Sequence, residues 1–253
     1  MEDDPPTVPI EPGTVDYTGK KLSTRIASEI ANQVANHHFD RCIKKGELII
    51  REVRGLENYL AVAEQGAIIT CNHFHPYDSF MMQKVFDASK RRGRMYRVIR
   101  EGNYTAFPGF YGMLMRNCDT LPLSSDPAAM KLFLKAVRRS LAAGDALLVY
   151  AEQSLWWNYR KPKPLKLGAF EMAVRSAVPV VPCFITFTDT DRIGEDGFPV
   201  LAYTPHIGAP IYPDLTLPKK EAAEKMRAEN EQFAKSVYER VYGKPLVYTT
   251  QKE

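Results

Sequence analysis

Short apolar segments rich in β-branched residues recur along this chain, and segments with helical spacing of apolar residues lie between them. The clearest apolar segments are Ala67–Cys71, Ala146–Ala151 and Val178–Ile185. Short uninterrupted apolar runs are typical of strands that are buried on both faces. Strands that alternate with helices predict an α/β fold, with a mixed, mostly parallel central sheet flanked by helices.

The rest of the chain continues this alternation, without an internal repeat or a linker. Helices are expected over Thr24–Phe39, Leu56–Ala63, Ser79–Ala88, Asp126–Ala143, Lys166–Ala177 and Lys219–Tyr242. Further strands are expected over Glu47–Val53, Tyr96–Ile99 and Val200–Ile207. We therefore expect a single domain over residues 18–253. Residues 1–17 are rich in proline and acidic side chains, which predicts a flexible N-terminal arm or one draped over the domain, rather than part of the core.

Composition argues against several classes of protein. Hydrophobic residues make up 45% and charged residues 25% of the chain, as in an ordinary packed globular protein. No segment approaches the roughly 18 apolar residues of a membrane span, and the start lacks the pattern of a secretory signal, so a cytoplasmic protein is expected. The cysteines Cys42, Cys71, Cys118 and Cys183 lack paired spacing, so neither a disulfide framework nor a zinc site is indicated.

Basic residues are concentrated in one stretch although the net charge is only +4. The members of this basic stretch are Lys90, Arg91, Arg92, Arg94, Arg97 and Arg100. Such a cluster suits phosphate, an anionic membrane surface or an acidic carrier protein. The alternation within it is equally consistent with a solvated edge strand. Because no nucleic-acid-binding motif accompanies it, nucleic acid is not an expected partner.

A histidine and an aspartate stand in the segment that directly follows the buried run Ala67–Cys71. His73 and Asp78 are separated by a turn that Pro76 favours, because proline resists continuing a strand and suits the first turn of a helix. A carboxylate on Nδ1 of an imidazole fixes the tautomer and directs Nε2 outward. With an unperturbed pKa of roughly 6.5, such an imidazole is a competent base near neutral pH.

Two other interpretations of this segment are open from the residues alone. His73 and Asp78 form a purely structural pair if the aspartate only caps the next helix. His73 and His75 form part of a metal site if further ligands come from elsewhere, but no cluster of ligand residues lies nearby in sequence. We therefore expect no metal.

The order of four segments resembles the glycerolipid acyltransferase family, which includes the lysophosphatidic acid acyltransferases. Asn72-His73-(four residues)-Asp78 is similar to the family's His-x4-Asp signature, and Phe107–Gly112 to its second block of proline, aromatics and glycine. Val149–Ser154 stands where the family has Phe-Pro-Glu-Gly-Thr-Arg, and Val178–Pro182 is similar to its fourth, apolar block. The resemblance covers Gly66 to Phe184 and implies the fold of that family.

The sequence departs from the family at the places that hold the acceptor's phosphate. Gln153 and Ser154 follow Glu152 where the family has glycine and threonine, with arginine next. The arginine that ends the second block is replaced near Ser124 and Ser125. A guanidinium is the natural bidentate partner of a phosphate. Either another basic residue replaces these arginines, with Arg116, Arg160, Lys161 and Lys163 as candidates, or the acceptor has no phosphate there.

The resemblance implies transfer of a fatty acyl group to a hydroxyl of a lysophospholipid or related lipid. The acyl donor is acyl-CoA or an acyl carrier protein, and no bound cofactor is expected. His73 is the expected general base and Asp78 its orienting carboxylate. A thiolate is a good leaving group, so Cys71 is not expected to act as a nucleophile. The expected substrate-binding residues are Asn72, Glu152, Gln153, Ser154, Arg116, Trp156, Trp157 and Arg160.

Amphiphilic substrates require contact with a bilayer. Trp156 and Trp157 lie beside basic residues, a pattern that suits either a membrane-interface loop or a wall of the substrate site. We expect peripheral association with the inner leaflet through the helix Thr24–Phe39 and the basic stretch. The alternative function is a non-catalytic lipid-binding or scaffold protein on the same fold.

Overall fold

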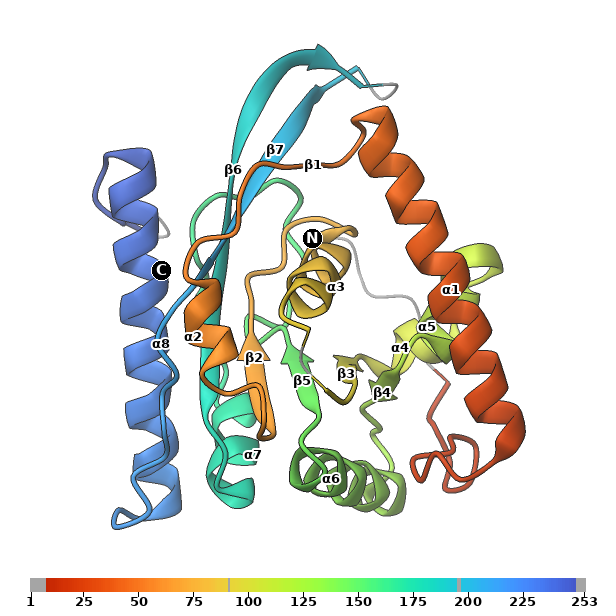
Figure 1. Cartoon of the computed structure of the whole chain (residues 1–253). Coiled ribbons are helices and arrows are strands. Elements are labelled where there is room, and N and C mark those ends of the chain that lie inside the picture. The colour runs from red at the N-terminus through yellow and green to blue at the C-terminus, as the bar shows by residue number, and fades with distance from the viewer. Residues whose placement is uncertain (1–7, 91, 195–196, 249–253) are drawn as a thin grey trace.

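The computed structural model describes residues 8–90, 92–194 and 197–248. Within these residues, seven strands form one sheet in the order β1-β7-β6-β2-β5-β3-β4. Neighbouring strands are parallel, except that β6 and β7 form an antiparallel hairpin. Figure 1 shows this hairpin rising beyond the other strands. The predicted mixed, mostly parallel sheet flanked by helices is therefore confirmed.

The described elements have the following bounds. The strands are β1 Ile49–Ile50, β2 Ala67–Thr70, β3 Met95–Ile99, β4 Thr120–Pro122, β5 Ala146–Val149, β6 Val180–Ile193 and β7 Pro199–Ile207. The helices are α1 Leu22–Lys45, α2 Leu56–Leu60, α3 Asp78–Ala88, α4 Glu101–Thr105, α5 Gly109–Asn117, α6 Pro127–Ala142, α7 Gly168–Ser176 and α8 Lys219–Tyr242. None of the described helices is long and apolar enough to cross a membrane.

The central strands carry side chains into two hydrophobic cores, one on each face of the sheet. Ile69 and Leu148 pack in the core that also contains residues of α1, α2 and α3. Ile68 and Leu147 pack in the other core, with α6, α7 and the start of α8. Successive side chains of a strand point to opposite faces, so a continuous apolar run is what a sheet covered on both faces requires. The carboxyl ends of β2 and β5, which are parallel neighbours, therefore emerge at one edge of the sheet.

Several predicted elements differ from the observed ones in extent. The strand expected at Val178–Ile185 continues to Ile193, because β6 leaves the core and pairs with β7 as an exposed hairpin. The strand expected at Glu47–Val53 is reduced to β1. Helices α4 and α5 and strand β4 were not predicted, since segments of five, nine and three residues are too short for a periodic signal. Within α5, a Cβ on Gly112 would lie 1.9 Å from the Phe107 carbonyl oxygen, which accounts for the glycine of the second block.

Residues 10–17 of the predicted N-terminal arm lie draped along the domain and are held at two points, while residues 1–7 lie outside the described residues. Ile10 is fully buried, and its backbone N–H donates to Glu101 Oε1 at 2.6 Å. Tyr17 is buried, and its hydroxyl donates to the Pro122 carbonyl at 2.7 Å. Proline and acidic composition indicated mobility, but these two apolar side chains are enough to anchor the segment beside β4.

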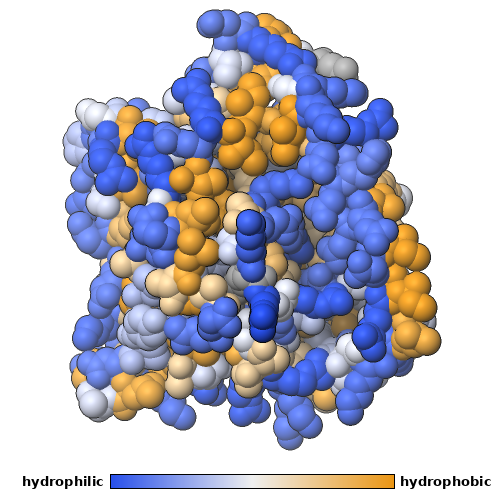
Figure 2. All heavy atoms as spheres, in the orientation of Figure 1, coloured by the Kyte–Doolittle hydropathy of each residue, from blue (hydrophilic) through white to orange (hydrophobic). Residues whose placement is uncertain are grey.

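Helix α1 extends beyond the predicted helix Thr24–Phe39 at both ends and leaves an apolar face exposed. Small and aromatic side chains, among them Ala31, Ala35 and Phe39, pack into the core. The large aliphatic side chains at four-residue spacing face outward, namely Leu22, Ile26, Ile30 and Val34, with 68%, 51%, 56% and 40% of their surface exposed. We refer to these four residues as the α1 stripe. Figure 2 shows apolar side chains along the right-hand edge of the molecule, where Figure 1 places α1.

Candidate active site

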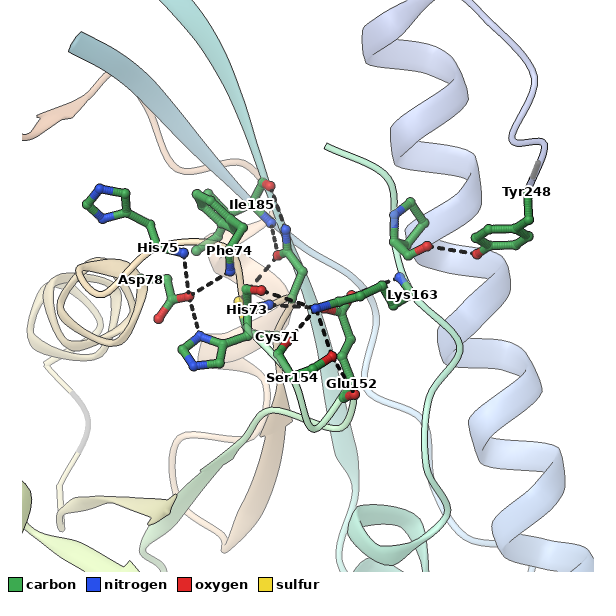
Figure 3. A network of polar contacts seen from close by, with 12 residues as sticks. Cys71, His73, Phe74, His75, Asp78, Glu152, Ser154, Lys163, Ile185 and Tyr248 are labelled. Carbon is green, nitrogen blue, oxygen red and sulfur yellow. Dashed lines mark hydrogen bonds and ion pairs between the residues drawn. The ribbon is translucent and has the colours of Figure 1, made fainter. Parts of the chain in front are cut away.

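The His73–Asp78 segment forms the predicted turn between β2 and α3. His73 Nδ1 lies 2.7 Å from Asp78 Oδ2, and Asp78 is the first residue of α3. The Asp78 backbone N–H donates to the His75 carbonyl at 3.1 Å, which closes the turn. With Nδ1 facing the carboxylate, the other ring nitrogen points away from Asp78 (Figure 3). The His73 side chain remains 24% exposed, so this nitrogen is in a position to meet a substrate.

Asp78 is fully buried and its carboxylate is surrounded by donors. Oδ2 also accepts the backbone N–H groups of Phe74 at 3.2 Å and His75 at 3.4 Å. Oδ1 accepts the hydroxyl of Tyr150 at 2.6 Å. These bonds, with the N-terminus of α3, compensate the charge of a buried carboxylate. The arrangement fixes the imidazole in the orientation that a general base requires.

Glu152 lies directly behind the histidine and forms a buried ion pair. Its Oε2 accepts the His73 backbone N–H at 3.2 Å and lies 3.1 Å from Lys163 Nζ, while Oε1 accepts the Lys163 backbone N–H at 3.0 Å. Burial raises the pKa of Glu152, and the Lys163 ammonium opposes part of that rise. Lys163 Nζ also contacts the Ser154 carbonyl and the His73 carbonyl, the latter at 3.4 Å (Figure 3). Glu152 and Lys163 thus join the His73 segment to the loop after β5.

A cavity of about 310 Å³ lies between this ion pair and α8. Glu152 and Lys163 stand among its lining residues, together with apolar side chains such as Leu165, Phe184 and Tyr248. The Tyr248 hydroxyl donates to the Pro162 carbonyl at 2.8 Å, so the chain beyond α8 covers part of this region (Figure 3).

Gln153 and Ser154 shape the loop that follows β5. Gln153 has a φ of 57°, in the left-handed region that glycine, the family's residue at this position, adopts most readily. Its backbone N–H donates to the Tyr150 carbonyl at 3.0 Å, and this turn places Glu152 behind His73. The Ser154 hydroxyl lies 3.2 Å from Lys163 Nζ. Both residues therefore contribute loop geometry to the site.

The two tryptophans lie beside the His73 segment, as parts of a loop that is hydrogen bonded to it. The Trp156 backbone N–H donates to the His73 carbonyl at 3.3 Å. The Trp157 ring lies 4.7 Å from that of His75, and Lys163 Nζ lies 5.1 Å above the Trp156 ring. Trp156 is 50% and Trp157 56% exposed. They form an exposed aromatic rim next to the histidine.

Three other residues expected to bind substrate are engaged with protein groups. Both ends of the Asn72 amide bond the backbone of Ile185, at 3.0 and 2.8 Å, so Asn72 fixes the end of β2 to β6. Arg160 pairs with Asp189 at 2.8 Å. Arg116 Nη1 donates to the carbonyls of Tyr104 and Phe107, at 3.3 and 3.0 Å. Asn72 therefore acts on the site through the backbone, and Arg116 stabilises the turn between α4 and α5.

Two members of the basic stretch, Arg94 and Arg97, are engaged in internal contacts. Arg94 Nη1 lies 2.8 Å from Asp119 Oδ1. Arg97 is buried on β3 and donates to the Cys118 carbonyl at 3.0 Å and to Gln83 Oε1 at 2.5 Å. Arg91 lies outside the described residues. Lys90, Arg92 and Arg100 are exposed, so a basic surface, if one is used, is formed by these residues and not by Arg94 and Arg97.

The described residues contain no group of three or more potential metal ligands, and His75 Nδ1 already accepts the Tyr77 backbone N–H at 3.1 Å. Cys71 is buried, and this burial raises the pKa of its thiol well above the ordinary value. A protonated buried thiol is a poor nucleophile, which agrees with the expectation for Cys71.

Two neighbours of His73 had not been assigned their observed roles from the sequence. Tyr150 was noted only as part of the third block, and Lys163 only as a candidate for binding phosphate. Tyr150 follows the buried strand β5, and Lys163 stands between two prolines in a loop. Neither position has a local sequence pattern that indicates which residue its side chain contacts. The separations of 72 residues between Tyr150 and Asp78 and 90 between Lys163 and His73 explain why.

Comparisons with known proteins point in the same direction as this geometry. The acyltransferase family model matches residues 50–186. An uncharacterized acyltransferase of Schizosaccharomyces pombe is 30% identical over 125 residues, which cover 48% of this chain and 42% of that protein. The match thus spans less than half the length of that relative.

The fold is similar to the crystal structure of the 1-acyl-sn-glycerophosphate (LPA) acyltransferase PlsC from Thermotoga maritima. The TM-score is 0.56 at 17% sequence identity, and the match covers 87% of this chain and 80% of PlsC. At this identity the likeness concerns the fold.

Proposed function

Since this chain belongs to the acyltransferase family, we propose that it transfers a fatty acyl group from an acyl thioester to a hydroxyl of a lysophospholipid or related lipid. The observation that carries the proposal is the contact of His73 Nδ1 with the buried Asp78 carboxylate, which leaves the opposite ring nitrogen facing outward. The thioester is acyl-CoA or the acyl group of an acyl carrier protein.

His73 Nε2 removes the proton of the acceptor hydroxyl as its oxygen attacks the thioester carbonyl carbon. Asp78 stabilises the imidazolium that results. When the tetrahedral intermediate collapses, the carbon–sulfur bond breaks and the thiolate leaves, taking a proton from the imidazolium. The products are the acylated lipid and the free thiol. No covalent acyl-enzyme is needed, which fits the buried, protonated state of Cys71.

The acceptor is proposed to be a lipid alcohol that has no phosphate monoester at the second-block position. Ser124, near which the family's arginine is replaced, donates its hydroxyl to the Ile10 carbonyl at 2.8 Å and lies 3.1 Å from Glu101 Oε1. A carboxylate there repels a phosphate, and the packed segment around Ile10 occupies adjacent space. Lys163, a candidate replacement, already neutralises Glu152.

The test is release of free thiol from acyl-CoA and, separately, from acyl carrier protein, with a panel of lysolipids and lipid alcohols. We expect turnover with at least one acceptor. Neutral or phosphodiester acceptors should give a kcat/KM about tenfold or more above that of lysophosphatidic acid, which corresponds to one unfavourable charge contact of about 1.4 kcal/mol. The product is identified by mass spectrometry.

Two results would count against this proposal. If no acceptor supports thiol release above the rate of simple hydrolysis, the result favours the alternative function of a non-catalytic lipid-binding protein. If lysophosphatidic acid is the best acceptor, the interpretation of Ser124 and Glu101 is wrong, although acyl transfer stands.

We also propose peripheral contact with the inner leaflet through the α1 stripe. Its exposed aliphatic residues repeat every four positions, as in helices that lie in a membrane interface. Exchanging Ile26 and Ile30 together for serine should lower the fraction of protein that floats with anionic phospholipid vesicles about tenfold, because two apolar side chains no longer enter the lipid. The matched control is Gln33→Ser, an exposed polar position on the same helix. Equal flotation of the double variant and the control would refute the membrane role of α1.

A further inference from the structure

Tyr150, at the end of β5, contacts both members of the His73–Asp78 pair. Its hydroxyl donates to Asp78 Oδ1 at 2.6 Å, while the other carboxylate oxygen faces His73. Its ring stacks on the His73 imidazole, with centroids 4.1 Å apart and an interplanar angle of 20°. One side chain therefore sets the position of the imidazole and shares the carboxylate with it.

The Tyr150 hydroxyl is the donor in its bond to Asp78. Burial raises the pKa of Tyr150 well above its ordinary value, and the adjacent Asp78 carboxylate raises it further. An ionised carboxylate accepts hydrogen bonds but donates none, so the proton of this bond lies on the tyrosine. A short bond of this kind to a charged acceptor draws negative charge away from the carboxylate.

The hydroxyl is absent from the family pattern that the third block resembles. In that pattern phenylalanine stands two residues before the glutamate, at the place of Tyr150 before Glu152. Phenylalanine supplies the stacking surface without the hydrogen bond. The tyrosine therefore adds a hydroxyl to this position, and that hydroxyl bonds Asp78.

We propose that Tyr150 is a positioning residue that, by hydrogen bonding Asp78, lowers the pH at which His73 becomes available as a base. This role rests on the proposed function of His73. The hydroxyl reduces the negative charge that Asp78 presents to the imidazolium, so the protonated ring is stabilised less and loses its proton at lower pH.

The other titratable and charged groups around the pair leave room for this effect. Glu152 and Lys163 approach His73 from the loop after β5 and compensate each other. Tyr203 faces Asp78 from β7, and burial raises the pKa of its hydroxyl, so it stays neutral. The remaining neighbours are the protonated Cys71 thiol, the Arg97 guanidinium, which acts on Tyr150, and the His75 ring, whose Nδ1 bonds Tyr77.

The experiment compares the wild type with Tyr150→Phe, which keeps the ring and removes the hydroxyl. Titration of the His73 ring is followed by NMR of the ¹⁵N-labelled protein, and the pH profile of kcat/KM is recorded with the best acceptor. We expect the NMR midpoint and the acid limb of the profile both to move up by about 0.5–1 pH unit. Tyr17→Phe loses a buried hydroxyl at β4 and is the matched control, with no shift expected.

An unchanged His73 midpoint in folded Tyr150→Phe overturns the proposal. A second comparison places Tyr150→Phe in an Asp78→Asn background and guards against indirect effects. The tyrosine substitution should change the His73 midpoint much less when the carboxylate is absent. An equal shift in both backgrounds also overturns the proposal. Because the NMR titration needs no acceptor, it distinguishes failure of this inference from failure of the proposed reaction. Thermal melting verifies that each variant is folded.

Discussion

Alanine in place of His73 is expected to lower kcat by about 10²–10⁴-fold with the best acceptor, because a positioned general base contributes about that much to the rate. The side chain is partly exposed, and the Asp78 carboxylate that it contacts lies on the same turn, so the fold should survive. Asp78→Asn should also lower kcat strongly, since an amide does not stabilise the imidazolium. Thiol release and circular dichroism, measured on the same preparations, test both statements.

The matched control for this prediction is His75→Ala. His75 stands two residues away on the same turn and is also an imidazole, but its Nδ1 accepts the Tyr77 backbone N–H rather than facing Asp78. We expect this variant to keep kcat within about fivefold of the wild type. If His73→Ala retains the activity of His75→Ala, His73 is not the base, and the role assigned to its contact with Asp78 is wrong.

Lys163→Met should destabilise the protein by about 3–5 kcal/mol, because it leaves the buried Glu152 carboxylate without its counter-charge. Methionine keeps most of the aliphatic length, so the effect reports mainly on charge. The measurement is urea unfolding followed by fluorescence. Lys161→Met is the matched control: this nearby lysine is partly exposed and bonds the Val247 carbonyl, and we expect a change of about 0.5 kcal/mol or less.

The pH dependence of this destabilisation has a definite sign. Burial raises the pKa of Glu152 in the folded protein, so its contribution to stability is greatest at pH values below the unfolded pKa and falls as pH rises through the folded value. Removing the ammonium, which opposes that rise, moves the loss further toward neutral pH. The stability gap between Lys163→Met and the wild type should therefore be smaller at pH 5 than at pH 8.

A second substitution tests whether the uncompensated charge is the cause. Adding Glu152→Gln to Lys163→Met removes the charge and should restore part of the lost stability. If the double variant is as unstable as the sum of the two single variants, packing around Lys163 is responsible instead.

The elements of the fold that were predicted correctly are those with a strong local signal. The apolar runs of β2, β5 and β6 were identified because a strand buried on both faces has few polar residues. Helix α6 was identified from its start, where the Asp126 carboxylate accepts the Ala129 backbone N–H at 2.8 Å. Helices α4 and α5 were missed because segments of five and nine residues carry too few turns for a periodic signal.

The face of α1 that meets the core shows why periodicity alone did not suffice. The spacing of apolar residues such as Ile26, Ile30 and Phe39 predicted an amphipathic helix, but it did not indicate which of them are buried. In the structure the helix approaches the core through Ala31 and Ala35, since small side chains allow close packing around Phe39. The hydrophobicity of its residues does not indicate which apolar face of a helix packs against the core.

The sequence by itself determined the contact between His73 and Asp78, because five residues with a turn at Pro76 bring the two groups together locally. It also indicated that Glu152 directly follows a buried strand, as the His73 segment does. Only the tertiary structure decided that Tyr150 shares the Asp78 carboxylate and that Lys163 neutralises Glu152. Those contacts join separate loops, so they depend on how β2 and β5 pair and how the chain after Glu152 returns to the sheet, which no local pattern encodes.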